Sequence, residues 1–226
     1  MTVLTRFYRK IRFGPPIVVV SGLPRSGTSM MMQMLAAGGL APLTDGIRTA
    51  DESNPEGYFE LEAVKTLDKL PSAQAAQADG DLAWLANARG KAVKILTPLL
   101  QYLPDTYNYR VILMQRPLDE VVTSQNTMLA RAGEATDVVP AGSVIKQYEA
   151  HLRKVQAMLA SRACFQTLTV RYGDVIADPR AQAEKVDQFV GGGLAIDRMA
   201  AAVHEGLYRN RTAQPRTGHS RTDESR

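Results

Sequence analysis

The chain has 226 residues and a single cysteine, Cys164, so it cannot form an internal disulfide bond. No apolar run approaches the roughly 18 residues that a membrane-spanning helix requires. The basic start of the chain also lacks an apolar stretch of signal-peptide length before Arg25. These absences exclude a disulfide scaffold, and they predict a cytoplasmic protein without a transmembrane segment.

A broad basic face is missing as well. Of the net charge of +4, residues 1–14 carry +4 and residues 209–226 carry +3, which leaves −3 for the residues between them. Nucleic-acid-binding proteins typically concentrate positive charge on the folded body, so this pattern argues against a nucleic-acid partner. We expect a basic N-terminal segment (1–16), one folded domain (17–211) and a disordered polar tail (212–226).

Four short apolar runs predict strands, and helical patterns separate them. The strands are expected at residues 17–20, 91–96, 110–115 and 165–171, and the helices at residues 28–35, 118–131, 143–160 and from Pro179 to just before Gly191. This alternation predicts an α/β fold of the P-loop type, with three α/β/α layers and a central parallel sheet. Residues 40–90 are rich in turn signals and predict loops, short helices and a lid.

The segment between the first strand and the first helix, residues 22–29 (GLPRSGTS), has the context of a phosphate-binding loop. Backbone N–H groups at a helix start converge on one point, and the helix dipole favours an anion there. The spacing of Gly22 and Gly27 matches a nucleotide P-loop, but Thr28 stands where that loop has lysine. Arg25, inside the loop, is its cation. The pattern therefore favours an anion other than the Mg²⁺-chelated tail of ATP.

The sequence PRSGTS after VVVSG resembles the 5′-phosphosulfate loop of sulfotransferases, in the form found in tyrosylprotein sulfotransferases and many bacterial members. Small-molecule sulfotransferases usually have lysine at the position of Arg25. The resemblance implies 3′-phosphoadenosine 5′-phosphosulfate (PAPS) as donor and a reaction without metal, and the chain shows no His/Cys/Asp ligand cluster. It also implies that Arg25 neutralises charge on the leaving group. The residues implied to hold the phosphosulfate are Pro24, Arg25, Ser26, Gly27, Thr28 and Ser29.

Two later segments are similar to the same family. Arg116 ends the third predicted strand and Ser124 follows eight residues later, which is the family's spacing for a 3′-phosphate site, although Pro117 comes one residue earlier than usual. Residues 170–179 resemble its R-Y-E-D…D-P segment, with Gly173 in place of the usual acidic residue, which implies that Tyr172 contacts adenosine. The alternative for Tyr172 is a tyrosine that anchors the strand end in the core. Arg209 is implied as a late basic contact to the 3′-phosphate.

The catalytic base is not evident from the sequence. Small-molecule sulfotransferases have a histidine shortly after a lysine on the second strand, whereas this chain has Lys94 there without a histidine. Its three histidines are His151, His204 and His219. A positioned carboxylate can also take the proton of an acceptor hydroxyl. Asp45 is the first candidate, because the tyrosylprotein enzymes have a glutamate about twenty residues after the loop; Glu60 and Glu62 follow. Lys94 is expected to assist electrostatically.

These observations predict a sulfotransferase that moves a sulfuryl group from PAPS to a hydroxyl or amine acceptor. A P-loop kinase or NTPase is a weaker alternative, because Thr28 replaces the phosphate-binding lysine. A non-catalytic nucleotide-binding protein on the same fold is a third alternative. Residues 40–90 are expected to shape the acceptor pocket, where Tyr58, Phe59 and Trp84 either line an apolar site or belong to the core.

Overall fold

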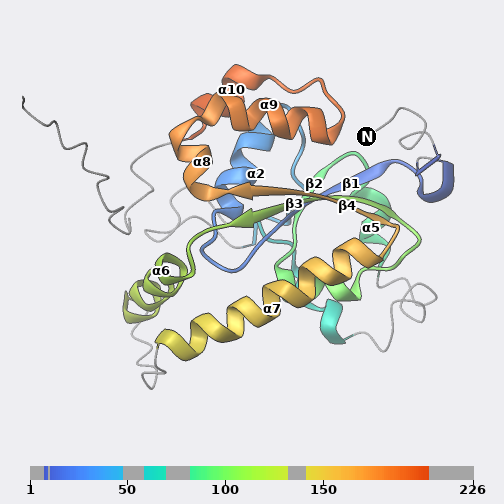
Figure 1. Cartoon of the computed structure of the whole chain (residues 1–226). Coiled ribbons are helices and arrows are strands. Elements are labelled where there is room, and N and C mark those ends of the chain that lie inside the picture. The colour runs from blue at the N-terminus through green and yellow to red at the C-terminus, as the bar shows by residue number, and fades with distance from the viewer. Residues whose placement is uncertain (1–7, 10, 48–58, 70–81, 132–140, 204–226) are drawn as a thin grey trace, which may run out of the picture.

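The computed structural model describes residues 8, 9, 11–47, 59–69, 82–131 and 141–203, and these form a three-layer α/β/α arrangement (Figure 1). The strands of the described sheet run parallel in the order β2-β1-β3-β4. They are β1 (Pro16–Ser21), β2 (Ala92–Lys94), β3 (Asn108–Gln115) and β4 (Phe165–Arg171). The predicted α/β class and parallel sheet are confirmed.

Helices cover both faces of the sheet (Figure 1). On one face lie α2 (Thr28–Ala37), α8 (Tyr172–Ala177), α9 (Pro179–Val190) and α10 (Ile196–Ala201). On the other lie α5 (Trp84–Asn87), η2 (Thr97–Tyr102), α6 (Leu118–Arg131) and α7 (Ala141–Ser161). The short elements α3 (Glu62–Lys65) and η1 (Leu67–Lys69) complete the described helices.

Each face of the sheet has its own apolar core, because successive strand residues point to opposite faces. On β1, Val18 and Val20 belong to the core that α2 covers, whereas Ile17 and Val19 belong to the core on the opposite face, which α7 covers. The α2 side is rich in methionine, whose flexible side chain fills irregular space between elements. Its buried methionines are Met30, Met31, Met32, Met34, Met114 and Met199. A strand buried on both faces explains why residues 17–20 show no polar alternation.

The predicted element bounds agree closely with the structure, with two kinds of difference. β2 is shorter than residues 91–96, because the chain passes from Lys94 into η2, which has a proline near its start. Helices α8 and α10 were not predicted. Each has only six residues, too few to show a clear helical period in the sequence.

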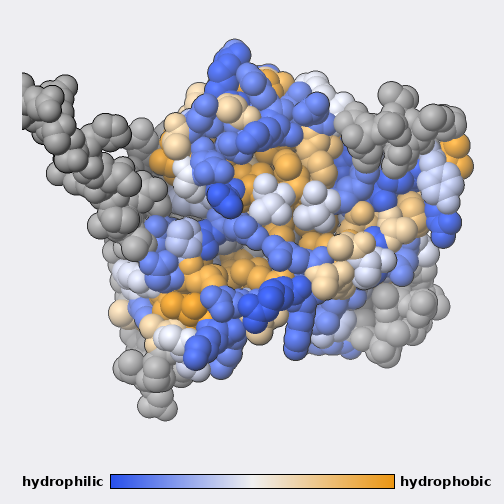
Figure 2. Space-filling model, viewed as in Figure 1, coloured by the Kyte–Doolittle hydropathy of each residue, from blue (hydrophilic) through white to orange (hydrophobic). Residues whose placement is uncertain are grey.

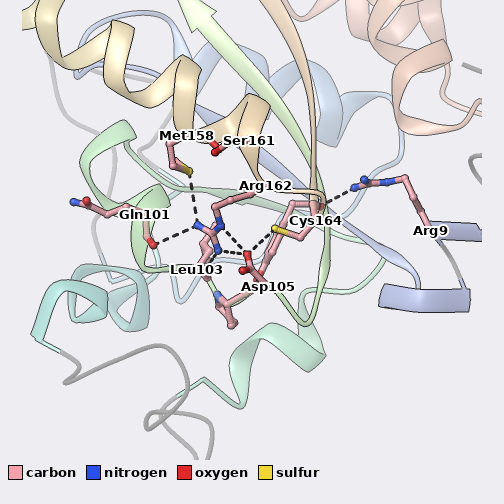
Figure 3. Close-up of polar contacts among 10 residues, drawn as sticks. Arg9, Gln101, Leu103, Asp105, Met158, Ser161, Arg162 and Cys164 are labelled. Atoms are coloured by element: carbon pink, nitrogen blue, oxygen red, sulfur yellow. Dashed lines mark hydrogen bonds and ion pairs between the residues drawn. The ribbon is translucent and has the colours of Figure 1, made fainter.

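A polar cluster ties chain segments together at the amino end of the sheet (Figure 3). Asp105 accepts hydrogen bonds from Arg162 Nε at 2.6 Å and from Cys164 Sγ at 3.2 Å. Arg9 Nη2 donates to the Cys164 carbonyl at 2.7 Å and to Asn108 Oδ1 at 2.9 Å. Burial raises the pKa of the Cys164 thiol to about 12, which favours its protonated form. The cluster is structural and lies away from the carboxyl ends of the strands.

β4 is one of the two edge strands of the described sheet, and Thr167 and Thr169 are exposed along it. Figure 2 shows apolar residues at the surface above and below the middle of this side of the molecule, with hydrophilic residues between them. Within the described ranges, no helix combines the length and the apolar character needed to cross a membrane.

The strand order places a reversal point between β1 and β3. From β1 the chain goes to β2 on one side, and it then crosses to β3 on the other side of β1. In open parallel sheets, ligands bind outside the carboxyl ends of the strands at such a reversal. The loop of residues 22–27 follows β1 and Arg116 follows β3, so both segments singled out in the sequence lie at this point.

Candidate active site

The loop after β1 has the backbone of a tight cradle. Gly27 adopts a φ of +100°, and Arg25 has a φ of +68°, which is unusual for a residue with a side chain. A Cβ atom on Gly27 would lie 2.4 Å from Cδ2 of Tyr172, so only glycine fits against this ring. Strained backbone of this kind is held by its surroundings and is concentrated at functional sites.

The start of α2 offers hydrogen-bond donors. Its N-cap residue, Gly27, supplies no side-chain cap, and the first turn contains no acidic residue. The Ser26 side chain is 2% exposed, and its hydroxyl has no hydrogen-bond partner among the described residues. A buried polar group without a partner is costly unless a ligand satisfies it. Together with the N–H groups that point out of a helix start, this hydroxyl suits an anion.

The two sequence motifs meet in space. Arg25 Nε donates a hydrogen bond to Ser124 Oγ at 3.1 Å, across a sequence separation of 99 residues. Arg116 Nη1 donates to the Arg25 carbonyl at 3.3 Å. Ser124 itself is buried. The structure therefore brings the cation of the first loop and the Arg116/Ser124 pair into one site.

Arg116 is held by side chains from two helices. Its Nε atom lies 2.9 Å from Glu120 Oε2 on α6, and both side chains are buried. Its guanidinium carbon lies 4.7 Å from the centre of the Tyr172 ring, which begins α8. Glu120 was not selected from the sequence, although an acid four residues after an arginine at a helix start was an available signal.

Glu60 and Lys94, both selected from the sequence, are neighbours. Lys94 Nζ lies 3.7 Å from Glu60 Oε1, and Lys65 Nζ lies 3.2 Å from Glu60 Oε2. Lys94 is largely buried at the end of β2, whereas the Glu60 side chain is 19% exposed. The residue before it, Phe59, has a φ of +51°, a second strained position beside the site. A carboxylate and a buried ammonium group thus lie together at the carboxyl end of the sheet.

Asp45 has a different environment. Its Oδ1 accepts a hydrogen bond from the Ile47 amide at 3.0 Å, and its Oδ2 accepts one from the Glu62 amide at 2.6 Å. These bonds, that from Glu62 first, lower the pKa of the Asp45 carboxyl group. The Glu62 side chain is 58% exposed and lies 3.1 Å from Lys65 Nζ. Asp45 therefore stabilises a turn, and Glu62 lies on the surface beside it.

One histidine lies closer to the loop than the sequence suggested. His151 Nε2, on α7, is 2.9 Å from Thr97 Oγ1, and the Thr97 amide donates to the Gly22 carbonyl at the start of the loop. Burial, with a smaller contribution from Lys154, lowers the pKa of His151, which favours the neutral imidazole. The sequence separation of 54 residues between His151 and Thr97 gave no signal of this contact.

The remaining selected residues are distributed around the site. Pro24 and Ser29 are partly exposed in the loop and at the start of α2, and Thr28 is buried there. Phe59 and Trp84 pack against opposite cores, so these two residues do not share one apolar pocket. Tyr58, Arg209, His204 and His219 lie outside the described residues.

Comparison with known proteins found similarity only among solved structures. No family model and no curated protein match the chain. The chain is similar to the sulfotransferase domain from the curacin biosynthetic pathway, with 12% identity and a TM-score of 0.48 over 84% of this chain and 78% of that chain. It is also similar to sulfotransferase STF1 from Mycobacterium tuberculosis H37Rv, with 17% identity and a TM-score of 0.48 over 87% and 73%. A likeness at this level assigns the chain to no family, and the function proposed below is supported by the residues of the site.

Proposed function

We propose that the chain is a sulfotransferase that transfers a sulfuryl group from PAPS to a hydroxyl or amine of an acceptor. The observation that carries this proposal is the convergence of Arg25, Arg116 and Ser124 at the reversal point of the sheet. Two guanidinium groups and a hydroxyl at one site suit a ligand with two separate phosphate-type anions. PAPS has such a pair, the 5′-phosphosulfate and the 3′-phosphate.

The loop residues fit the 5′-phosphosulfate. The Ser26 hydroxyl is buried without a partner among the described residues, and α2 begins without a side-chain cap. These donors and Arg25 would hold the anion, and the guanidinium of Arg25 would neutralise charge on the departing phosphate. Arg116 and Ser124 would hold the 3′-phosphate. PAPS supplies the sulfuryl group, whose sulfur forms a bond to the acceptor oxygen or nitrogen as its bond to the phosphate oxygen breaks.

Glu60 is the strongest candidate for the base. Its carboxylate lies beside Lys94 at the carboxyl end of β2, whereas both oxygens of Asp45 already accept backbone hydrogen bonds. Glu60 would take the acceptor's proton, and Lys94 would stabilise negative charge near the sulfuryl group.

The proposal is tested by isothermal titration calorimetry with 3′-phosphoadenosine 5′-phosphate (PAP) in the absence of metal, and with ATP in the presence of Mg²⁺. We expect PAP to bind with a Kd of about 1–10 μM and Mg-ATP to bind at least tenfold more weakly, because the loop lacks the lysine of a nucleotide P-loop. Preference for Mg-ATP would support a kinase or NTPase instead. Binding of PAP without PAPS turnover on a panel of hydroxyl and amine acceptors would favour the non-catalytic alternative.

A further inference from the structure

Tyr172 lies at the junction of the two phosphate motifs. The register of the sheet pairs Gln115 at the end of β3 with Arg171 at the end of β4. The residues that follow them, Arg116 and Tyr172, therefore lie side by side. The ring of Tyr172 packs against Gly27 on the loop and against the Arg116 guanidinium, 4.7 Å from the ring centre. One aromatic ring therefore contacts both motifs.

The surroundings of Tyr172 leave little of its ring for a ligand. The residue is 4% exposed and belongs to the core on the α2 side of the sheet. A nucleotide base stacks on an aromatic side chain only where a face of the ring is accessible. A guanidinium over an aromatic face is attracted by the ring quadrupole, and the attraction grows when water is excluded.

Arg116 depends on this ring for its orientation. Its Nε is bound to buried Glu120, and its Nη1 reaches the Arg25 carbonyl, so the guanidinium plane is fixed by groups on two sides and by the ring below it. A guanidinium binds a phosphate best when its planar fork is held in one orientation before the ligand arrives.

Resting on the proposed function, we propose that Tyr172 is a positioning residue that orients Arg116 toward the 3′-phosphate of the nucleotide, and that it does not bind the adenine base. The expected consequence is selective. Loss of the ring weakens binding of a nucleotide that carries a 3′-phosphate and leaves the binding of one without it nearly unchanged.

The test compares the Kd of PAP with that of adenosine 5′-monophosphate (AMP), which lacks the 3′-phosphate, in the full chain by calorimetry. The variants are Tyr172→Phe, Tyr172→Met and Tyr172→Leu, with Arg116→Ala as the reference for loss of the 3′-phosphate contact. Methionine suits the methionine-rich surroundings, so it offers a second folded variant if leucine is not tolerated. Tyr109→Leu is the matched control, because Tyr109 is a buried tyrosine of the opposite core. The centre of its ring lies 5.1 Å from the centre of the Phe165 ring.

In the wild type, PAP is expected to bind at least about tenfold more tightly than AMP, since a 3′-phosphate adds charge-assisted hydrogen bonds. Tyr172→Met and Tyr172→Leu should lower this ratio roughly fivefold or more, as Arg116→Ala does, through loss of PAP affinity alone. Tyr172→Phe, which keeps the ring, and Tyr109→Leu should leave the ratio unchanged.

Equal weakening of PAP and AMP by Tyr172→Met or Tyr172→Leu would overturn the inference, because the ring would then act on the base or on the 5′-phosphate loop, which both nucleotides share, and not through Arg116. An unchanged ratio in these variants, with a lowered ratio in Arg116→Ala, would also overturn it while leaving the proposed function intact. If the wild type binds no PAP, the proposed function fails and the inference fails with it.

Discussion

Glu60 and Asp45 carry the same chemical group in neighbouring turns, yet their surroundings prepare them for different tasks. The Glu60 carboxylate faces two ammonium groups, those of Lys94 and Lys65, of which Lys94 is buried at the end of β2. The Asp45 carboxylate is occupied by two backbone amides and is fully exposed. The two backbone hydrogen bonds lower the pKa of Asp45 and hold both of its oxygens in the turn, whereas the Glu60 carboxylate lies beside the buried Lys94.

This difference predicts opposite results for two conservative substitutions. Glu60→Gln removes the proton acceptor and should lower kcat for PAPS-dependent transfer by roughly 10²- to 10⁴-fold, the range for loss of a general base. Asp45→Asn should change kcat by less than about fivefold, because an amide oxygen can still accept one backbone hydrogen bond. The kcat of each variant is measured by steady-state kinetics with an acceptor identified in the panel of hydroxyls and amines. The PAP affinity of each variant is measured by calorimetry.

Affinity for PAP should be similar in both variants, since neither carboxylate is placed against the nucleotide. If Asp45→Asn abolishes transfer and Glu60→Gln retains it, the assignment of the base is reversed.

Helix α2 has a glycine before it and another after it that share the same left-handed φ but differ in the atoms packed against them. Gly27, before the helix, has a φ of +100°, and Gly39, just after it, has a φ of +101°. A Cβ on Gly27 would lie 2.4 Å from the Tyr172 ring, whereas a Cβ on Gly39 would meet nothing within 4 Å. Gly39 is therefore a matched control for the contact between Gly27 and the Tyr172 ring.

Both Gly27→Ala and Gly39→Ala should lose about 1–2 kcal/mol of unfolding free energy from the left-handed backbone alone. Gly27→Ala should lose about 1–3 kcal/mol more, because the ring must move to admit a methyl group. Urea denaturation measures both losses, and PAP affinity should fall only in Gly27→Ala. Equal losses in the two variants would mean that the Tyr172 ring moves aside freely when residue 27 carries a methyl group.

The elements of this fold follow from local sequence, because buried strands and amphipathic helices leave periodic patterns. The runs IVVV and FQTLTVR, and the helix from Pro179 to just before Gly191, were predicted close to their observed bounds. Contacts across the fold leave no such pattern. The strand order, the pairing of Lys94 with Glu60, and the approach of His151 to Thr97 depend on how the sheet is assembled.

For the candidate site, the sequence indicated candidate residues but not their partners. The Gly-rich loop and Arg116 were selected because their residue types and spacing are distinctive. Glu120 was missed because an acid in the first turn of a helix is ordinary. The contacts of the Tyr172 ring were not predicted either, since nothing in the local sequence shows that it faces Gly27 and Arg116.

For the whole molecule, the site is a consequence of topology. The sheet order β2-β1-β3-β4 places the ends of β1 and β3 side by side at the reversal point. The register of β3 and β4 places Arg116 and Tyr172 together just beyond the carboxyl ends of these strands. β2 brings Lys94 to the other side of the loop, paired in register with Val20 of β1. Two candidate anion-binding groups and a candidate catalytic pair therefore lie at the carboxyl end of a single parallel sheet.

In the proposed site, Arg25 and Arg116 hold one nucleotide between them. Calorimetry without metal tests this claim by comparing the PAP affinity of the wild type, Arg25→Ala, Arg116→Ala and the double variant, with Arg153→Ala as control. Arg153 is exposed on α7, with its own partner Glu149 on the same helix.

We predict that Arg25→Ala and Arg116→Ala each weaken PAP binding by roughly tenfold or more, since each removes a charge-assisted contact to a phosphate. The double variant should show no measurable binding, and Arg153→Ala should match the wild type. Unchanged PAP affinity in both single arginine variants would contradict the claim.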